Sequence, residues 1–280
     1  MQAVCRTTMA PILLPVFLCC ATPAVLRGPE GPVDNRERPS PSAALLKFPE
    51  PSGDRPLLAI LIDDAGESLS QLEPFMDIPL PLSFAVLPAT SHPVEVATAL
   101  KAQGRDLLAH IPMEPVSADQ ISGRGFLMTA MSTRQLLKTL DWNLGRVPGA
   151  LGVNNHMGSR FTRDVRAMTV VFDELKRRGL YFLDSRTDPA TACNEAARRT
   201  RIRFMERDIF LDNDPASAAI EGMLQKALDL ARTRGCAIAI GHPRAATAEV
   251  ITRLARDPDR DVDVIPVTRL LGHPCLSAGP

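Results

Sequence analysis

Residues Leu57–Gly66 read LLAILIDDAG, an apolar run that ends abruptly in two adjacent carboxylates, Asp63 and Asp64. Neither alternating set of the run is polar, which predicts a strand that is buried on both faces. Two carboxylates at the tip of such a strand repel each other and lose hydration, so a cation, a proton or a reaction must offset that cost. The alternative is that one aspartate caps the following helix while the other faces water.

The chain repeats this pattern of apolar strand, polar tip and helix from Leu57 to Leu271. Strands that alternate with helices pair in parallel through right-handed crossovers. The pattern predicts an α/β fold, an irregular and incomplete (β/α) barrel of about seven parallel strands, with a doubly wound open sheet as the alternative. Both folds bring the carboxyl ends of the strands to one rim. The polar tips expected there are Asp63 with Asp64, His110 with Glu114, Asn155 with His156, Asp184, Asp212 and His242.

The two ends of the chain differ from this pattern. Residues 1–24 are typical of an export signal, because a positive start is followed by the apolar run Met9–Cys20, too short to span a bilayer, and then by small residues. An uncleaved anchor is the alternative. Residues 25–56 are rich in proline, glycine and charge, which predicts a disordered linker. The barrel is expected over residues 57–271, and residues 272–280 are expected to form a frayed tail.

Composition excludes several functions. The 32 basic and 32 acidic residues cancel, so charge gives no basis for binding nucleic acid or an anionic membrane surface. No GxGxxG follows the first strand and the chain has no phosphate-loop sequence, which argues against a nucleotide cofactor. Of six cysteines, Cys193, Cys236 and Cys275 lie outside the export signal. We expect Cys236 in the core, and a Cys193–Cys275 bridge is conceivable in an oxidising compartment.

Three of the five histidines lie at strand tips. A carboxylate and two imidazoles with open positions are typical of a catalytic site for zinc or a similar divalent ion, and we assign Asp64, His110 and His156 as its ligands. Adjacent strand residues point to opposite sides, so Asp63 is free to act as the general base. His242, between a glycine and a proline, is the candidate general acid for a leaving amine.

Three further residues are candidates for contact with a substrate. Pro112 disfavours a helix between His110 and Glu114, and an extended chain separates the two too far to share an ion, so Glu114 is assigned to substrate contact, with metal ligation through a turn as the alternative. Asn155 and Ser159 offer neutral hydrogen bonds to a sugar hydroxyl or an oxyanion, or else serve as turn residues. Residues 184–187, Arg207 and Asp212 are expected to form a buried layer of ion pairs.

Six segments in order resemble the divergent polysaccharide deacetylase family, and together they span about Leu57–Leu271. They are LIDDAG at Leu61–Gly66, AHIPMEP at Ala109–Pro115, GVNNHMGSRFT at Gly152–Thr162, FLDSRT at Phe182–Thr187, RDIFLD at Arg207–Asp212 and AIAIGHP at Ala237–Pro243. The resemblance implies a distorted barrel like that of deacetylase-type carbohydrate esterases, and export to a bacterial envelope, with the periplasm as the expected location.

In those esterases the first aspartate of the pair is the base and the second is a ligand, which implies these roles for Asp63 and Asp64. Their third-strand motif has two histidines four residues apart, where this chain has His110 and Glu114; His156 is the candidate replacement. Their late catalytic histidine corresponds to His242. Their Arg-x-Pro motif is absent, and NNHMG stands in its place.

We therefore predict a metal-dependent amide hydrolase that removes acetyl groups from an envelope polysaccharide or peptidoglycan-type glycan, with a divalent metal, zinc by preference, as cofactor. The alternative is a catalytically inactive periplasmic module that binds a glycan or a protein through the same pocket. A metal-dependent phosphoesterase is a third, weaker hypothesis, because it calls for more basic residues at the rim than this chain supplies.

Overall fold

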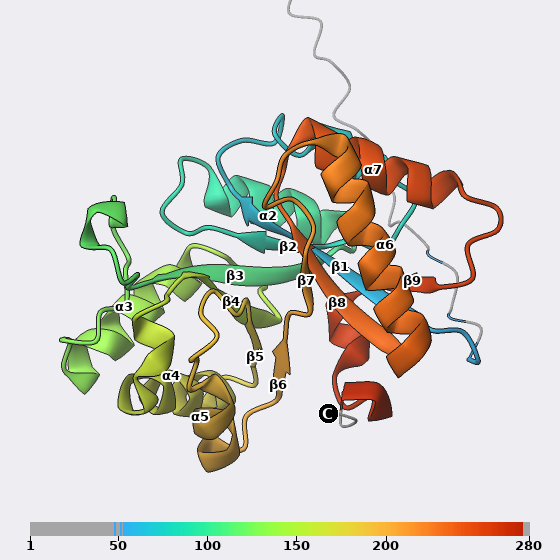
Figure 1. The fold of residues 1–280 in the computed structure, drawn as a ribbon. Coiled ribbons are helices and arrows are strands. Elements are labelled where there is room, and N and C mark those ends of the chain that lie inside the picture. Colours follow the sequence, from blue (N-terminus) through green and yellow to red (C-terminus); the bar gives the residue numbers. More distant parts are fainter. Residues whose placement is uncertain (1–47, 49–50, 52, 277–280) are drawn as a thin grey trace, which may run out of the picture. The chain divides into compact units, whose positions relative to one another are not determined.

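A computed structural model describes residues 48, 51 and 53–276, all of which lie in one compact unit of residues 43–280 (Figure 1). The predicted export signal and most of the predicted linker therefore lie outside the described residues. Where the end of the linker is described, the guanidinium of Arg105 lies 5.2 Å from the ring of Phe48, and the Pro56 carbonyl accepts a hydrogen bond from the Asp263 amide. None of the described helices is both long and apolar enough to cross a membrane.

Within the described residues, nine strands form one sheet in which every pairing is parallel. The sheet order is β6-β5-β4-β3-β2-β1-β8-β7, and β9 pairs with β1 beside this path. The strands are β1 (Leu57–Ala65), β2 (Ser83–Val86), β3 (Asp106–Met113), β4 (Gly152–Met157), β5 (Tyr181–Asp184), β6 (Phe204–Glu206), β7 (Ile209–Phe210), β8 (Cys236–Gly241) and β9 (Asp263–Ile265).

The chain itself joins the two ends of this sheet. Only Arg207 and Asp208 separate β6, which pairs with β5, from β7, which pairs with β8. The Arg207 amide donates to the Asp184 carbonyl on one side, and the Asp208 amide donates to the Ile238 carbonyl on the other. This arrangement confirms the predicted irregular α/β barrel and excludes the doubly wound open sheet. The two short strands β6 and β7 stand where a single strand was expected to end at Asp212. They pair at opposite ends of the sheet.

Helices connect the strands and cover the outside of the sheet (Figure 1). They are α1 (Glu73–Met76), α2 (Pro93–Ala102), α3 (Thr133–Gly145), α4 (Val165–Arg177), α5 (Cys193–Thr200), α6 (Ser217–Arg234) and α7 (Ala245–Arg256). Their starts follow local chemistry: Ser132 and Gln135 form a capping box on α3, and the Asp164 side chain caps α4. Gly235, in the left-handed conformation, ends α6.

The alternation along each strand divides the core into two parts. On β1, Leu58, Ile60 and Ile62 pack against the helices, whereas the other set faces the barrel interior. Because strand side chains alternate strictly, this division also decides which polar residues at the strand ends point inward. The interior set at the amino ends is mainly apolar and includes Leu57, Leu108, Tyr181, Ile238 and Ile265.

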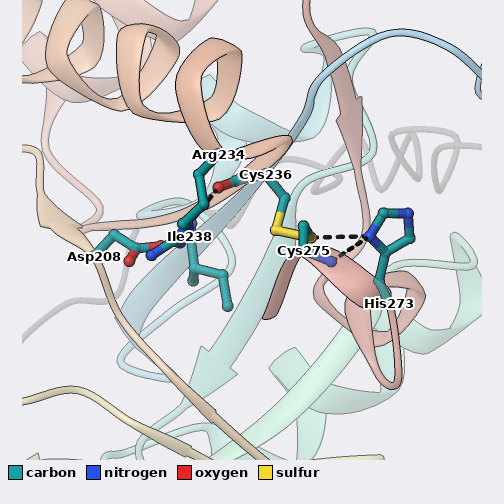
Figure 2. The surroundings of a disulfide bond; sticks show 6 residues. All are labelled: Asp208, Arg234, Cys236, Ile238, His273 and Cys275. Atoms are coloured by element: carbon teal, nitrogen blue, oxygen red, sulfur yellow. Dashed lines mark hydrogen bonds and ion pairs between the residues drawn. A yellow bond between two sulfur atoms is a disulfide. The ribbon is translucent and has the colours of Figure 1, made fainter. Parts of the chain in front are cut away.

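The segment after β9 closes the amino end of the barrel. The Val267 amide donates to the Ser83 hydroxyl, and both the amide and the hydroxyl of Thr268 donate to the Asp106 carboxylate. A disulfide joins Cys275 to Cys236 at the start of β8, with His273 Nδ1 lying 2.9 Å from Cys275 Sγ (Figure 2).

This disulfide corrects two expectations from the sequence. The partner of Cys275 is Cys236 rather than Cys193, which is a buried free cysteine in α5. Residues 274–276, expected in a frayed tail, form a short 3-10 helix held to the barrel by the disulfide. The reason is the inward direction of Cys236, which faces the closing segment and not the helix layer.

Candidate metal centre

The inward-facing set of each strand becomes polar at the carboxyl end of the barrel. Asp63 continues the interior series of β1 after Leu61, and His110 continues that of β3 after Leu108. Asn154 on β4 and His242 after β8 occupy the equivalent positions. Three of these four side chains are buried, Asp63, His110 and Asn154, with exposures of 2%, 2% and 0%. The fold thus gathers hydrogen-bonding and ionisable groups in the mouth of the barrel.

Asp64 joins this group because the end of β1 is irregular. The register with β2 shifts between Ile62 and Ala65, and Asp64 has a φ of 55°, in the left-handed region. A bulge of this kind re-aims a side chain that regular alternation would turn outward. Non-glycine residues hold such a conformation at a cost, and they gather at functional sites. Both carboxylates of the pair therefore reach the same cavity, one by alternation and the other by the bulge.

Three donor atoms meet beside this bulge. Asp64 Oδ1 lies 3.2 Å from His110 Nε2 and 2.9 Å from His156 Nδ1, and the two imidazole nitrogens are 3.3 Å apart. Two protonated ring nitrogens would repel each other at this distance. Zinc ligands at about 2.0–2.1 Å in tetrahedral geometry are separated by about 3.3 Å, so the triangle fits one face of a zinc site. Asp64, His110 and His156 are therefore suited to hold a divalent ion.

The charged forms of Asp64 and His110 stabilise each other. Burial by itself would raise the pKa of Asp64, but hydrogen bonds from His110 and His156 hold that pKa well below its usual range. Burial would lower the pKa of His110, yet Asp63 and Asp64 raise it to about 9. Asp64 is therefore a permanent carboxylate, which is the state that a cation requires of its ligand.

Asn154 links the base candidate to a ligand candidate. Its amide nitrogen donates to Asp63 Oδ1 at 2.8 Å, and its amide oxygen lies 2.9 Å from His110 Nδ1. With the oxygen as acceptor, His110 Nδ1 carries a proton, so Nε2 is the nitrogen that would give up its proton to bind a cation beside Asp64 and His156. Such an outer partner fixes the tautomer and orientation of a ligating histidine.

Asp63 lies directly behind the three donors, with its carboxylate 3.7 Å from His110 Nε2. Burial is the largest influence on Asp63 and raises its pKa, an effect that the nearby Asp64 charge reinforces. A buried carboxylate that holds a proton more readily than usual is suited to general-base chemistry.

His242 lies at another side of the cavity and is oriented by Asp212. His242 Nδ1 and Asp212 Oδ1 are 2.7 Å apart, and the Asp212 carboxylate also accepts from the His242 amide and the Thr247 hydroxyl. Gly241 permits this approach, since a Cβ there would lie 3.0 Å from Thr247 Cγ2 and 3.6 Å from Asp212 Oδ2. The opposite nitrogen, His242 Nε2, lies 3.9 Å from Asp64 Oδ2. Burial opposes protonation of His242, but Asp212 raises its pKa overall.

These groups line one open cavity of about 330 Å³. Its walls include all five of the predicted metal and acid–base residues, namely Asp63, Asp64, His110, His156 and His242, together with Gln120, Asn155 and Ser159. The cavity is both polar and apolar in its lining, and it is large enough for a small ligand.

The three predicted substrate contacts have different surroundings. Both ends of the Asn155 amide are used internally, donating to the Met157 carbonyl and accepting from the Ser185 amide. The Ser159 hydroxyl accepts from the Val116 amide at the edge of the cavity. Glu114 is not among the cavity-lining residues, because its carboxylate accepts from the amide and hydroxyl of Thr129. Glu114 therefore holds a loop beside the site, and its contact with a substrate stays a prediction.

Sequence reasoning missed the roles of Asn154 and Asp212. Like Asn155, Asn154 was expected to be a hydrogen-bond partner of a substrate or a turn residue, and Asp212 was expected in an ion-pair layer. That layer is not what the structure contains: Asp184 accepts from the Arg186 amide and the Thr191 hydroxyl, and Arg207 donates to the backbone carbonyls of residues 185, 186 and 208. The available signal was parity, since Asn154 lies two residues before His156 on the same strand face.

The fold and this site define the class of the protein. It is a deacetylase-like (β/α) barrel with its polar groups at the carboxyl ends of the strands. The structure of the T48 deacetylase with substrate has this fold, with a TM-score of 0.50 at 11% identity over 78% of this chain and 92% of that one. The uncharacterized protein ATU2773 from Agrobacterium tumefaciens C58 gives a TM-score of 0.76 at 21% identity, covering 80% of this chain and 92% of that one.

Sequence comparison identifies the family. The family model of divergent polysaccharide deacetylases matches residues 60–271. The uncharacterized protein YibQ of Escherichia coli (strain K12) is 36% identical over 217 residues, which cover 78% of this chain and 68% of that protein. The chain belongs to the divergent polysaccharide deacetylase family, as its six motifs predicted.

Proposed function

We propose that the protein is a metal-dependent hydrolase that removes acetyl groups from amino sugars of an envelope glycan. One observation carries this proposal: a three-donor group, Asp64, His110 and His156, is flanked by a carboxylate, Asp63, and by an oriented histidine, His242. Amide hydrolysis needs a base for the attacking water and an acid for the departing amine, and these two groups satisfy both requirements. Membership of the family supports a carbohydrate amide as the substrate class.

A divalent ion held by the three donors would supply Lewis acidity toward the amide carbonyl. The chain's own groups do the remaining work. Asp63, held by Asn154, accepts a proton from water. His242 Nδ1 donates to Asp212, which leaves His242 Nε2 facing the cavity to protonate the amine. Asp212 also accepts two further hydrogen bonds, so the imidazole cannot rotate without loss of its partner.

The test is release of acetate from N-acetylated amino sugars and from peptidoglycan fragments by the zinc-loaded protein. We expect turnover in the wild type and a loss of about a hundredfold or more in Asp63→Asn and in His242→Ala, since general acid–base groups contribute about 10²–10⁴. Both variants should retain zinc, because neither removes one of the three proposed ligands. Fully metallated wild type that releases no acetate from any N-acetylated glycan would contradict the proposal.

A non-catalytic module that binds a glycan or a protein is the second candidate function. It is favoured by Glu114, which stands where esterases of this type have a second histidine and which is engaged with Thr129. This candidate predicts glycan binding without acetate release, and a cell phenotype of the deletion that His242→Ala still complements.

We also propose that the protein acts in the bacterial periplasm, on the basis of the apolar run Met9–Cys20 after a basic start. Fractionation of cells carrying the full chain, with and without residues 1–24, tests this location. Recovery of the full chain with the cytoplasmic fraction would contradict it.

A further inference from the structure

A second hollow of about 360 Å³ lies next to the candidate metal centre. It is formed between the loop after β7 and the first half of α6, and its lining is predominantly apolar, with Phe210, Leu211, Ala219 and Met223. Phe210 and Asn213 line both this hollow and the cavity that contains Asp63 and His242. The two spaces therefore adjoin at these two residues.

Gly222 of α6 is one of the residues that line the hollow. It lies inside α6, where a glycine lowers helix stability relative to alanine. A Cβ built at this position meets no atom within 4 Å, so the packing of the helix does not require glycine. Gly222 is exposed and lines the hollow, so a larger side chain at this position would have room to extend over it.

The position of Phe210 indicates which part of a substrate would lie near the hollow. Its ring stacks on that of His242, with centroids 6.2 Å apart and an interplanar angle of 22°. In the proposed reaction His242 protonates the leaving amine, so the sugar and the group attached to it lie on the His242 side. The lining residues that are not exposed are all apolar, which suits an alkyl chain better than further sugar units.

We propose that this hollow is a subsite for the alkyl aglycone of a lipid-linked or otherwise alkylated amino sugar whose acetamide occupies the metal centre. The inference rests on the proposed function and narrows its substrate class. Asp214 and Lys226 also line the hollow and are exposed. The expected ligand has a polar sugar at the metal centre and an apolar chain against Leu211, Ala219 and Met223.

The experiment compares the affinities of methyl and hexyl glycosides of N-acetylglucosamine for the zinc-loaded protein by titration calorimetry. Burial of each methylene is worth about fourfold in affinity, so burial of two gives a hexyl advantage of more than about tenfold. Gly222→Leu fills the hollow and should reduce the advantage to less than about twofold without changing the affinity for the methyl glycoside.

Two further variants test whether the hexyl advantage in affinity depends on the hollow. Gln225→Leu places the same side chain at an exposed position of α6 that does not line the hollow, and it should keep the advantage. Met223→Glu places a charge among the apolar side chains, and it should abolish the advantage even if Gly222→Leu fails to fold. A methyl glycoside with an N-hexanoyl group in place of N-acetyl should gain nothing.

Equal affinities of the two glycosides for wild type, or an advantage that survives both hollow variants, would overturn the subsite. If only the N-hexanoyl compound gains affinity, and this gain depends on Gly222, the hollow does not bind the aglycone. Binding also separates this inference from catalysis. Acetate release with equal affinities refutes the subsite and leaves the hydrolase, whereas a hexyl advantage without acetate release supports the subsite and counts against the hydrolase.

Discussion

The two ends of the barrel are built from the same strands but with different chemistry. At the amino ends the interior is mainly apolar and is closed by the segment after β9 and the Cys236–Cys275 disulfide. At the carboxyl ends the same inward positions hold Asp63, His110 and Asn154, which are buried and bonded to one another. The amino end therefore has a composition suited to stabilising the fold, and the carboxyl end has that of a functional site. This division is common in parallel barrels.

The difference shows that a site of this kind has a cost in folding stability. Buried ionisable groups are tolerated only when they are paired and hydrogen-bonded, and Asp64 additionally keeps a left-handed backbone conformation. Substitutions at the amino end should therefore reduce stability and spare metal binding, and substitutions at the carboxyl end should do the reverse. The predictions below test this division.

The largest effect is expected for Asp64→Asn. Loss of the carboxylate removes one of three proposed ligands, and zinc affinity should fall by more than the roughly 10–100-fold that loss of an outer partner costs. Stability without metal should change little, since reduced repulsion from Asp63 offsets the lost ion pairs with His110 and His156. Competition with a chelator measures the affinity.

Asp106→Asn is the matched control for Asp64→Asn, because the Asp106 carboxylate accepts hydrogen bonds from Thr268 in the closing segment. This variant should lose about 1–3 kcal/mol of unfolding free energy and keep its zinc. A reversed result, with zinc lost in Asp106→Asn and retained in Asp64→Asn, would break the division between the two ends.

Removal of the disulfide is expected to have the next effect. Cys236→Ala combined with Cys275→Ala should lower the free energy of unfolding by about 2–4 kcal/mol, because the bond closes a long loop with a sequence separation of 39. Urea titration of the oxidised wild type and the double variant measures the change. Zinc stoichiometry should be the same in both, and a fall in stoichiometry would show that the two ends are coupled.

Asn154→Ala should reduce zinc affinity by about 10–100-fold, although Asn154 is not a ligand, because His110 loses the partner that fixes its tautomer. Asn143→Ala is the control: it is another buried asparagine, bonded to the carbonyls of Gly125 and Thr139 and remote from the centre. It should cost stability and leave affinity unchanged. Equal affinities of the two variants for zinc would refute the positioning role of Asn154.

The smallest effect is expected at a surface cluster of charges at the end of α4. Hydrogen bonds from Arg177 and Arg178 lower the pKa of Glu174 to about 2. A depressed pKa adds stability above the unfolded value, near 4.3, and this stability disappears as the pH falls through about 2. Glu174→Gln should therefore be less stable at pH 7 by less than about 1 kcal/mol, with the deficit vanishing at low pH. Thermal unfolding at several pH values measures it.

Much of the architecture was predictable from the pattern of apolar runs. Strands buried on both faces, each followed by a helix, required a parallel sheet covered by helices, and the polar tips required a common rim. Even the inward direction of Asp63, His110 and His242 follows from parity with Leu61, Leu108 and Ile240.

The remainder depends on geometry that parity does not contain. The bulge that turns Asp64 inward breaks the alternation on which the argument rested. Glu114 bonds to Thr129, fifteen residues later in the chain, through a loop whose path no periodicity predicts. The pairing of Cys236 with Cys275 depends on where the chain returns after β9. Local patterns therefore located the rim, while long-range packing decided which side chains meet there.

The most direct test of the metal centre is anomalous diffraction from crystals of the zinc-loaded protein. We predict a peak within about 2.0–2.2 Å of the Asp64 carboxylate, His110 Nε2 and His156 Nδ1 together. A zinc peak that lies beyond coordinating distance of any of these three atoms, or beside Glu114, would contradict the account.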